Sequence, residues 1–139
     1  MVPRTSLFRR GGLLLILALL VVAGCGQKNH PVKGKVTFKE NGKPLGAGHV
    51  LFQLVSDPDI KASGDIEEDG SYELGNSKGM GALAGEYEVL VQPRMLENDP
   101  TKSPIDNRFR DFKTSGLKYT VKPGSNEFNI EVERPGKKK

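Results

Sequence analysis

Tryptophan is absent from this chain of 139 residues, and it has only one cysteine and two histidines. A single cysteine excludes a disulfide within the chain. Two histidines leave few groups for general base catalysis, which wants a base beside an orienting acid, or for a histidine-rich metal site. The absence of tryptophan also argues against a sugar-binding surface built from exposed aromatic side chains. These shortages argue against an enzyme and against a metalloprotein.

A long hydrophobic run is missing as well. The longest apolar run, residues 13–23, has about half of the roughly 20 residues that cross a bilayer. Arg4, Arg9 and Arg10 precede it without any acid, and Gly24 and Cys25 follow it. A charged start, a short apolar run and a small-residue end are typical of a signal peptide rather than a membrane helix. We therefore expect residues 1–24 to be a signal peptide.

The end of this segment, Val22-Ala23-Gly24-Cys25, resembles the lipobox of bacterial lipoproteins. The resemblance implies cleavage before Cys25 and a diacylglycerol on its sulfur, which makes residues 25–30 a lipidated cysteine and a tether. It also implies an extracytoplasmic protein anchored by lipid to the cell membrane or the outer membrane. Two or three acyl chains make such an anchor durable. The alternatives are an ordinary secretory signal with a free thiol at Cys25, or a cysteine buried in the core.

Basic and acidic residues nearly balance once the two ends of the chain are set aside. The formal charge is +4, but three arginines fall in the signal peptide and four basic residues fall in the tail at 134–139. Residues 25–133 then hold 14 basic and 17 acidic side chains, which gives no support to a nucleic-acid partner. We expect the basic tail to be disordered and solvated, and contact with an anionic polymer or headgroup is the alternative.

From residue 31 onward, apolar and polar residues alternate in short runs, which is the pattern of half-buried strands. Turn sequences such as Asn41-Gly42 and Asp69-Gly70 separate most of these runs. No stretch after residue 25 shows sustained helical periodicity. We therefore predict an all-β fold, a single antiparallel seven-stranded β-sandwich over residues 31–133. The predicted strands lie at 32–38, 50–54, 62–66, 72–74, 87–91, 117–121 and 128–132.

A series of turn and core motifs runs through the mature chain. They are Val32-Lys33-Gly34-Lys35-Val36-Thr37-Phe38, Asn41-Gly42-Lys43-Pro44-Leu45, Gly46-Ala47-Gly48-His49-Val50-Leu51-Phe52, Glu68-Asp69-Gly70-Ser71-Tyr72, Gly81-Ala82, Gly85-Glu86-Tyr87 and Thr114-Ser115-Gly116-Leu117, with Gly124, Asn126 and Phe128 near the end. In this order they resemble carboxypeptidase-regulatory-like domains, and the last motifs resemble a subgroup found on small bacterial lipoproteins. The resemblance implies a transthyretin-like, Ig-like sandwich and says little about chemistry.

Candidates for catalysis and metal binding are few. His30 falls in the tether and His49 opens a strand out of phase with its core residues, so we expect both to be surface histidines. Acidic residues gather at 57–69, but the EF-hand spacing is absent, and turns explain Asp57 and Asp69. We predict no enzyme, no metal and no cofactor, and a cation bound by segment 57–69 stays open as an alternative.

The connection at 93–115 is the longest stretch without a clear period, where typical connections have about four to six residues. Long connections of this kind tend to be functional or disordered, and arginines and aromatics are enriched at interface hot spots. The candidate interaction surface is therefore Arg94, Arg108, Phe109, Arg110 and Phe112. The alternative is that Phe109 and Phe112 cap an open end of the sandwich.

Two functional hypotheses follow from these patterns. In the first, the domain is non-catalytic and serves as a structural, adhesion or protein-interaction module of the cell envelope, with an envelope protein as its partner. In the second, it is an accessory that binds a glycan, a small molecule or a cation for an envelope system.

Overall fold

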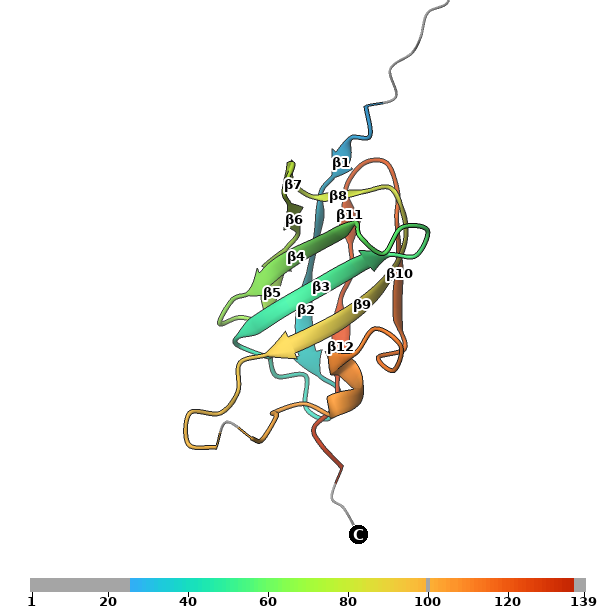
Figure 1. Cartoon of the computed structure of the whole chain (residues 1–139). Coiled ribbons are helices and arrows are strands. Elements are labelled where there is room, and N and C mark those ends of the chain that lie inside the picture. Colours follow the sequence, from blue (N-terminus) through green and yellow to red (C-terminus); the bar gives the residue numbers. More distant parts are fainter. Residues whose placement is uncertain (1–25, 100, 137–139) are drawn as a thin grey trace, which may run out of the picture.

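The computed structural model describes residues 26–99 and 101–136, which form strands and one short 3₁₀ turn (Figure 1). Cys25, the signal peptide and the lysines at 137–139 lie outside the described residues. No helix in the described part is long and apolar enough to cross a bilayer. The elements are β1 (Asn29–His30), β2 (Val32–Phe38), β3 (Gly48–Leu54), β4 (Lys61–Ile66), β5 (Ser71–Glu73), β6 (Gly75–Asn76), β7 (Gly79–Met80), β8 (Ala82–Leu83), β9 (Gly85–Pro93), η1 (Asn107–Arg110), β10 (Leu117–Val121), β11 (Asn126–Glu127) and β12 (Ile130–Val132).

Two sheets pack face to face. One has six strands in the order β10-β9-β3-β4-β6-β7, and all of its pairings are antiparallel. In the other, β2 pairs with β5 on one side and with β11 and β12 on the other. Buried and exposed residues alternate along β2 and β4, as strands with one face in the core require. The predicted all-β sandwich is confirmed, and its seven strands correspond to β2, β3, β4, β5, β9, β10 and β12.

Two pairings depart from the antiparallel expectation. The first long strand, β2, runs parallel to β11 and β12, which hold one common register with it. Between them, at Phe128 and Asn129, the ladder is modified. Phe128 N donates to Lys33 O at 2.9 Å, whereas the side-chain Oδ1 of Asn129 accepts the hydrogen bond from Lys35 N at 3.0 Å.

An aromatic cluster fills the space between the sheets. The ring of Phe52 on β3 lies 5.8 to 6.4 Å, centroid to centroid, from the rings of Tyr72, Tyr87, Tyr119 and Phe128. These rings come from both sheets and meet the Phe52 ring in tilted or edge-to-face arrangements, which aromatic pairs favour. The rings of Tyr119 and Phe128 are stacked on each other, 4.7 Å apart. All five lie in the strands predicted from the alternation, and Tyr119 and Phe128 are only half-buried.

Gly34 on β2 permits a close backbone approach inside this cluster. A Cβ at Gly34 would lie 1.9 Å from the carbonyl oxygen of Phe128 and 3.0 Å from the ring of Tyr72. The Tyr72 hydroxyl crosses Gly34 and donates to Phe128 O at 2.6 Å. Burial raises the pKa of Tyr72, so its hydroxyl keeps the proton that this hydrogen bond uses.

The start of the chain departs from the predicted boundary between tether and domain. Asn29 and His30, expected in the tether, form β1 and pair with β8. The amide of Asn29 exchanges two hydrogen bonds with that of Asn76, at 2.9 and 3.0 Å. These contacts join backbone groups and amide side chains to a glycine-rich segment, so no alternation of apolar residues predicts them. Only Gly26, Gln27 and Lys28 lie between Cys25 and the first strand.

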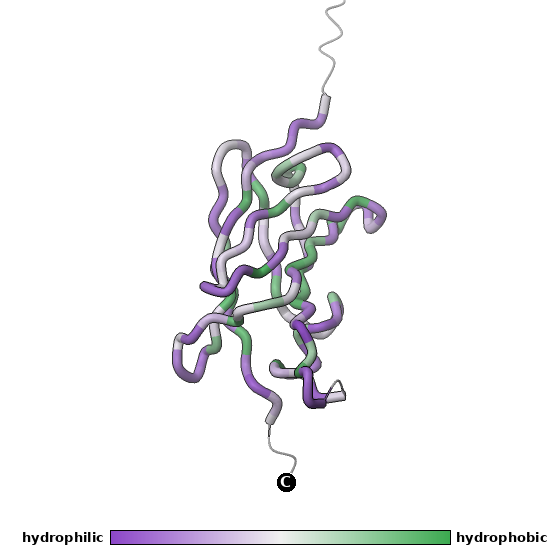
Figure 2. The backbone as a smooth tube through the Cα atoms, turned by 90° about the vertical axis from the view of Figure 1, so that its left-hand side faces the viewer, coloured by the Kyte–Doolittle hydropathy of each residue, from purple (hydrophilic) through white to green (hydrophobic). Residues whose placement is uncertain are grey.

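The two ends of the described chain lie at opposite ends of the sandwich (Figure 1). β1 lies at one end together with β7 and β8, whereas the connection after β9, the η1 turn and the C-terminal segment lie at the other. Figure 2 shows hydrophilic residues along the turns at both ends and alternating hydropathy along the strands between them. The fold therefore has an N-terminal end and a C-terminal end that lie far apart (Figure 1).

Candidate functional site

The candidate interaction residues divide into two groups. Arg94 is exposed in the first half of the connection that follows β9, and Arg108, Phe109 and Arg110 belong to η1 in the second half. Phe109 is only 3% exposed and belongs to the core, as does Ile105. The second half of the connection is therefore docked on the sandwich rather than free.

The η1 turn brings Phe109 into the core through a local hydrogen-bond pattern. Asp106 caps the turn, because its side chain accepts from Arg108 N at 2.9 Å. Asp106 N in turn donates to Glu133 O at 2.8 Å and joins the turn to the residue after β12. Phe109 cannot be a contact residue for a partner while it is buried in this way. Its burial fits the capping alternative, in which the ring closes an open end of the sandwich.

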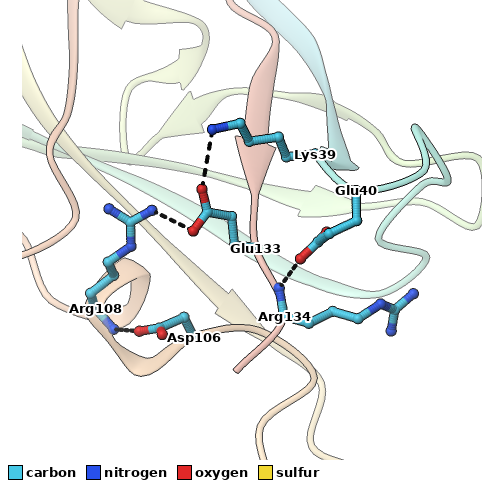
Figure 3. Close-up of polar contacts among 6 residues, drawn as sticks. All are labelled: Lys39, Glu40, Asp106, Arg108, Glu133 and Arg134. Carbon is cyan, nitrogen blue, oxygen red and sulfur yellow. Dashed lines mark hydrogen bonds and ion pairs between the residues drawn. The ribbon is translucent and has the colours of Figure 1, made fainter. Parts of the chain in front are cut away.

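Arg108 and Glu133 lie at the centre of a charged network (Figure 3). It joins the connection to the C-terminal end of β2 and to the C-terminal end of β12. The Arg108 guanidinium lies 3.0 Å from Glu133 Oε2 and 4.3 Å above the Phe109 ring, and Lys39 Nζ lies 3.4 Å from Glu133 Oε1. All of these charged side chains are exposed to solvent, where an ion pair contributes about 1 kcal/mol or less. The network orients the connection and adds little to stability.

A second contact in Figure 3 holds the start of the C-terminal segment. Glu40 Oε1 accepts from Arg134 N at 2.7 Å, and this backbone hydrogen bond is the main cause that lowers the pKa of Glu40. The Arg134 guanidinium lies 4.1 Å above the ring of Phe38. Arg134, predicted to begin a disordered tail, is therefore fixed against the end of β2, and such contacts supply a modest cation–π attraction.

The remaining candidate residues lie in different environments. Arg110 donates from Nη1 to Asn107 Oδ1 at 3.2 Å, while its Nε is buried with no hydrogen-bond partner among the described residues. Phe112 is half-buried, and Arg94 is exposed. Leu96, with 43% of its surface exposed, lies two residues after Arg94. Leu96 was not among the residues predicted for the interaction surface. The signal that could have identified it is an apolar residue in a polar, proline-rich stretch.

A groove of about 890 Å³ lies on the outer face of the smaller sheet. Charges of both signs line it, with lysines on β2 and acidic residues on β4, β5 and β11 and just after β4. Met80 on β7, with 63% of its surface exposed, forms part of its apolar wall. The lining side chains with charge or apolar bulk are Lys33, Lys35, Asp65, Glu67, Glu73, Glu127 and Met80. This groove was not predicted, because its lining comes from strands that are remote in the sequence rather than from any local pattern.

His49 and the acidic residues of segment 57–69 lie on the surface of the domain. His49 Nδ1 lies 2.6 Å from Asp65 Oδ1, and both side chains are more than half exposed. Asp57 and Asp69 accept backbone hydrogen bonds from Asp59 and Ser71, as turn residues do. Hydrogen bonds from Ser71 lower the pKa of Asp69. Within residues 26–99 and 101–136, no three His, Cys, Asp or Glu side chains converge as metal ligands would.

The comparisons with known proteins concern the fold alone. No protein-family model matches the chain, and no curated protein does. Among solved structures, the chain is similar to the crystal structure of BcpA, the major pilin subunit of Bacillus cereus, in a D312A form. The TM-score is 0.51 at 9% identity, over 78% of this chain and 30% of the pilin. At this identity the likeness shows only that the two proteins share a β-sandwich fold.

A DUF3823 family protein from Parabacteroides merdae is similar at a TM-score of 0.48 and 18% identity, over 76% of this chain and 46% of that protein. The chain thus spans less than half the length of either of these two neighbours. Identities this low show the fold alone, and the resemblance to carboxypeptidase-regulatory-like domains stays a prediction.

Proposed function

We propose that this protein is a lipoprotein of the cell envelope whose non-catalytic β-sandwich holds a partner protein away from the membrane. The observation that carries the proposal is the placement of the two ends of the domain (Figure 1). The first strand at the N-terminal end begins at Asn29, four residues after Cys25, the cysteine of the lipobox-like motif. The opposite end carries the long connection, whose first half exposes Arg94 and Leu96.

The chemistry of the described surface supports binding rather than catalysis. An acyl-transfer or general base site needs a nucleophile or base held in a sheltered pocket. His49 and Asp65 are instead exposed on neighbouring strands. The exposed combination of a guanidinium and an aliphatic side chain at Arg94 and Leu96 offers a cationic and an apolar contact for a protein partner.

Substituting Cys25→Ser tests the anchor. We expect the variant to leave the membrane fraction or to accumulate as an unprocessed precursor, because the proposed lipid is attached through the sulfur of this one residue. The measurement is detergent-phase partitioning of cell extracts, with the wild type as reference. Equal partitioning of the variant and the wild type would contradict the lipoprotein proposal.

The interaction end is tested by the double substitution Arg94→Ala with Leu96→Ala. We expect proteins captured by mild cross-linking in intact cells to be lost, while the melting temperature stays near that of the wild type because both side chains are exposed. The matched control is Lys118→Ala with Val55→Ala, an exposed cation on β10 and an exposed aliphatic residue after β3, both outside the connection. Identical capture by both double variants and the wild type would show that this end is not the interaction surface.

The groove on the smaller sheet supports a second candidate function, an accessory that binds a ligand. Its size is within the range of small-molecule sites, and Lys33 and Lys35 line it together with several acidic residues. A ligand that suits this lining carries both positive and negative groups. A screen of glycans, zwitterionic small molecules and divalent cations, with Lys33→Gln and Lys35→Gln as site variants, distinguishes this role from the first.

A further inference from the structure

Three segments far apart in the sequence meet around β1. On one side, the side chain of Asn29 is hydrogen-bonded to Asn76 at the start of the β6–β7 hairpin. On the other side, His30 Nδ1 accepts from Gly124 N in the β10–β11 turn at 3.2 Å. The buried amide of Asn126 also donates to Pro31 O at 3.3 Å. The hairpin and the turn are therefore held beside the first residues of the domain.

These three segments form a basic end of the molecule. Residues 26–31, 74–85 and 121–126 contain Lys28, Lys78 and Lys122, all exposed, and no acidic residue. The rest of residues 26–136 holds 12 lysines and arginines against 17 acidic residues. The three segments thus carry a net charge of +3 and the rest of residues 26–136 carries −5, with Glu73, Glu86 and Glu127 directly bordering the basic segments.

The position of the proposed anchor places this basic end next to the membrane surface. Four chain steps separate Cys25 from Asn29, so an acylated Cys25 holds Asn29 within roughly 14 Å of the lipid attachment. The Debye length at physiological salt is about 8 Å, and a tether this short lets the basic end fold down onto the headgroups, where the surface potential acts on its lysines. We infer that the basic end, Lys28 with Lys78 and Lys122, docks on the anionic lipid headgroups of the leaflet that holds the anchor.

This inference rests on the proposed lipid anchor and extends it from attachment to orientation. A lysine near an anionic leaflet contributes about fivefold to the bound-to-free ratio. That contribution is too small to recruit a soluble protein by itself, but the anchor makes docking intramolecular, where weak contacts act at a high effective concentration. The consequence is that the domain stands upright, with the connection end directed away from the membrane.

The test uses the mature, lipidated protein in vesicles. Ser77→Cys in the β6–β7 hairpin supplies a single free thiol for a fluorophore, and Asn98→Cys supplies the same label in the connection after β9. The vesicles contain phosphatidylcholine and a lipid with a spin-labelled headgroup, with or without phosphatidylglycerol. Quenching of the fluorophore reports contact with the headgroups, and flotation of the vesicles separately reports the anchor.

We expect stronger quenching at position 77 than at position 98, an increase at position 77 with phosphatidylglycerol, and a decrease at high salt. Lys78→Gln with Lys122→Gln should lower the docked-to-free ratio about 25-fold. The control, Lys43→Gln with Lys113→Gln, removes two exposed lysines outside the basic end and should change nothing.

Two results would overturn the inference, and they differ in what else they overturn. If the protein floats with the vesicles but quenching is equal at the two positions, or is insensitive to Lys78→Gln with Lys122→Gln, the docking is wrong and the anchor stands. If the protein does not float, the anchor fails and the docking fails with it.

Discussion

Replacing Gly34 by alanine is expected to unfold or nearly unfold the domain, with a loss of about 4 kcal/mol or more, a range that few single substitutions reach. The physical reason is a backbone contact, because the new Cβ would lie 1.9 Å from Phe128 O. A backbone carbonyl held between β11 and β12 cannot rotate away as a flexible side chain can. Relief requires β11 and β12 to separate from β2, which would also break the hydrogen bond from the Tyr72 hydroxyl to Phe128 O. Urea unfolding of the purified domain measures the loss.

Two further variants separate the clash from other causes. Tyr72→Phe removes only the hydroxyl and should cost about 1 kcal/mol, far less than Gly34→Ala. Gly136→Ala should be neutral, since no atom lies within 4 Å of a Cβ at that position. A Gly34→Ala protein with the stability of the Gly136→Ala protein would show that β2 and Phe128 do not approach as described.

Phe109→Ala is expected to cause the second large loss, about 3 to 5 kcal/mol, the usual cost of deleting a buried aromatic side chain. The ring is nearly inaccessible and packs in the core between η1 and the sandwich. Its removal opens a cavity at the C-terminal end and frees the Arg108 guanidinium that lies above it. Thermal unfolding followed by circular dichroism measures the effect.

Phe112→Ala is the matched control for this substitution, because Phe112 lies in the same connection and is only half-buried. It should cost clearly less than Phe109→Ala. If instead the two variants melt together at the wild-type temperature, and cross-linked partners disappear in Phe109→Ala alone, then Phe109 contacts a partner and the connection is not docked as the structure has it.

The sequence predicts the long strands well because their side chains alternate. In β2, each core residue from Val32 to Phe38 is separated from the next by a polar one, and the structure buries the residues of that phase. The short strands β6, β7 and β8 escaped prediction, since two-residue strands rich in glycine carry no period. Their positions depend on backbone pairing with β4 and β1, and a pattern of side chains does not encode such pairing.

The candidate site was less predictable than the fold. The connection at 93–115 was chosen for its length and its arginines, but Phe109 and Ile105 show that burial of a lone apolar residue in a loop depends on distant strands. Gly34 illustrates the same limit from within a strand. The alternation places it on the core side of β2, whereas its contact is with Phe128, whose position relative to β2 only the tertiary structure defines. Properties that arise from pairing remote segments were therefore the ones that the sequence could not supply.

The proposed anchoring through Cys25 is tested most directly by the covalent state of that residue in the cell. Tandem mass spectrometry of the protein isolated from membranes is the measurement. The account predicts a mature chain that begins at Cys25, with a diacylglycerol on its sulfur and Gly26 as the next residue. An unmodified thiol at Cys25, or peptides from residues 1–24 in the mature protein, would contradict it.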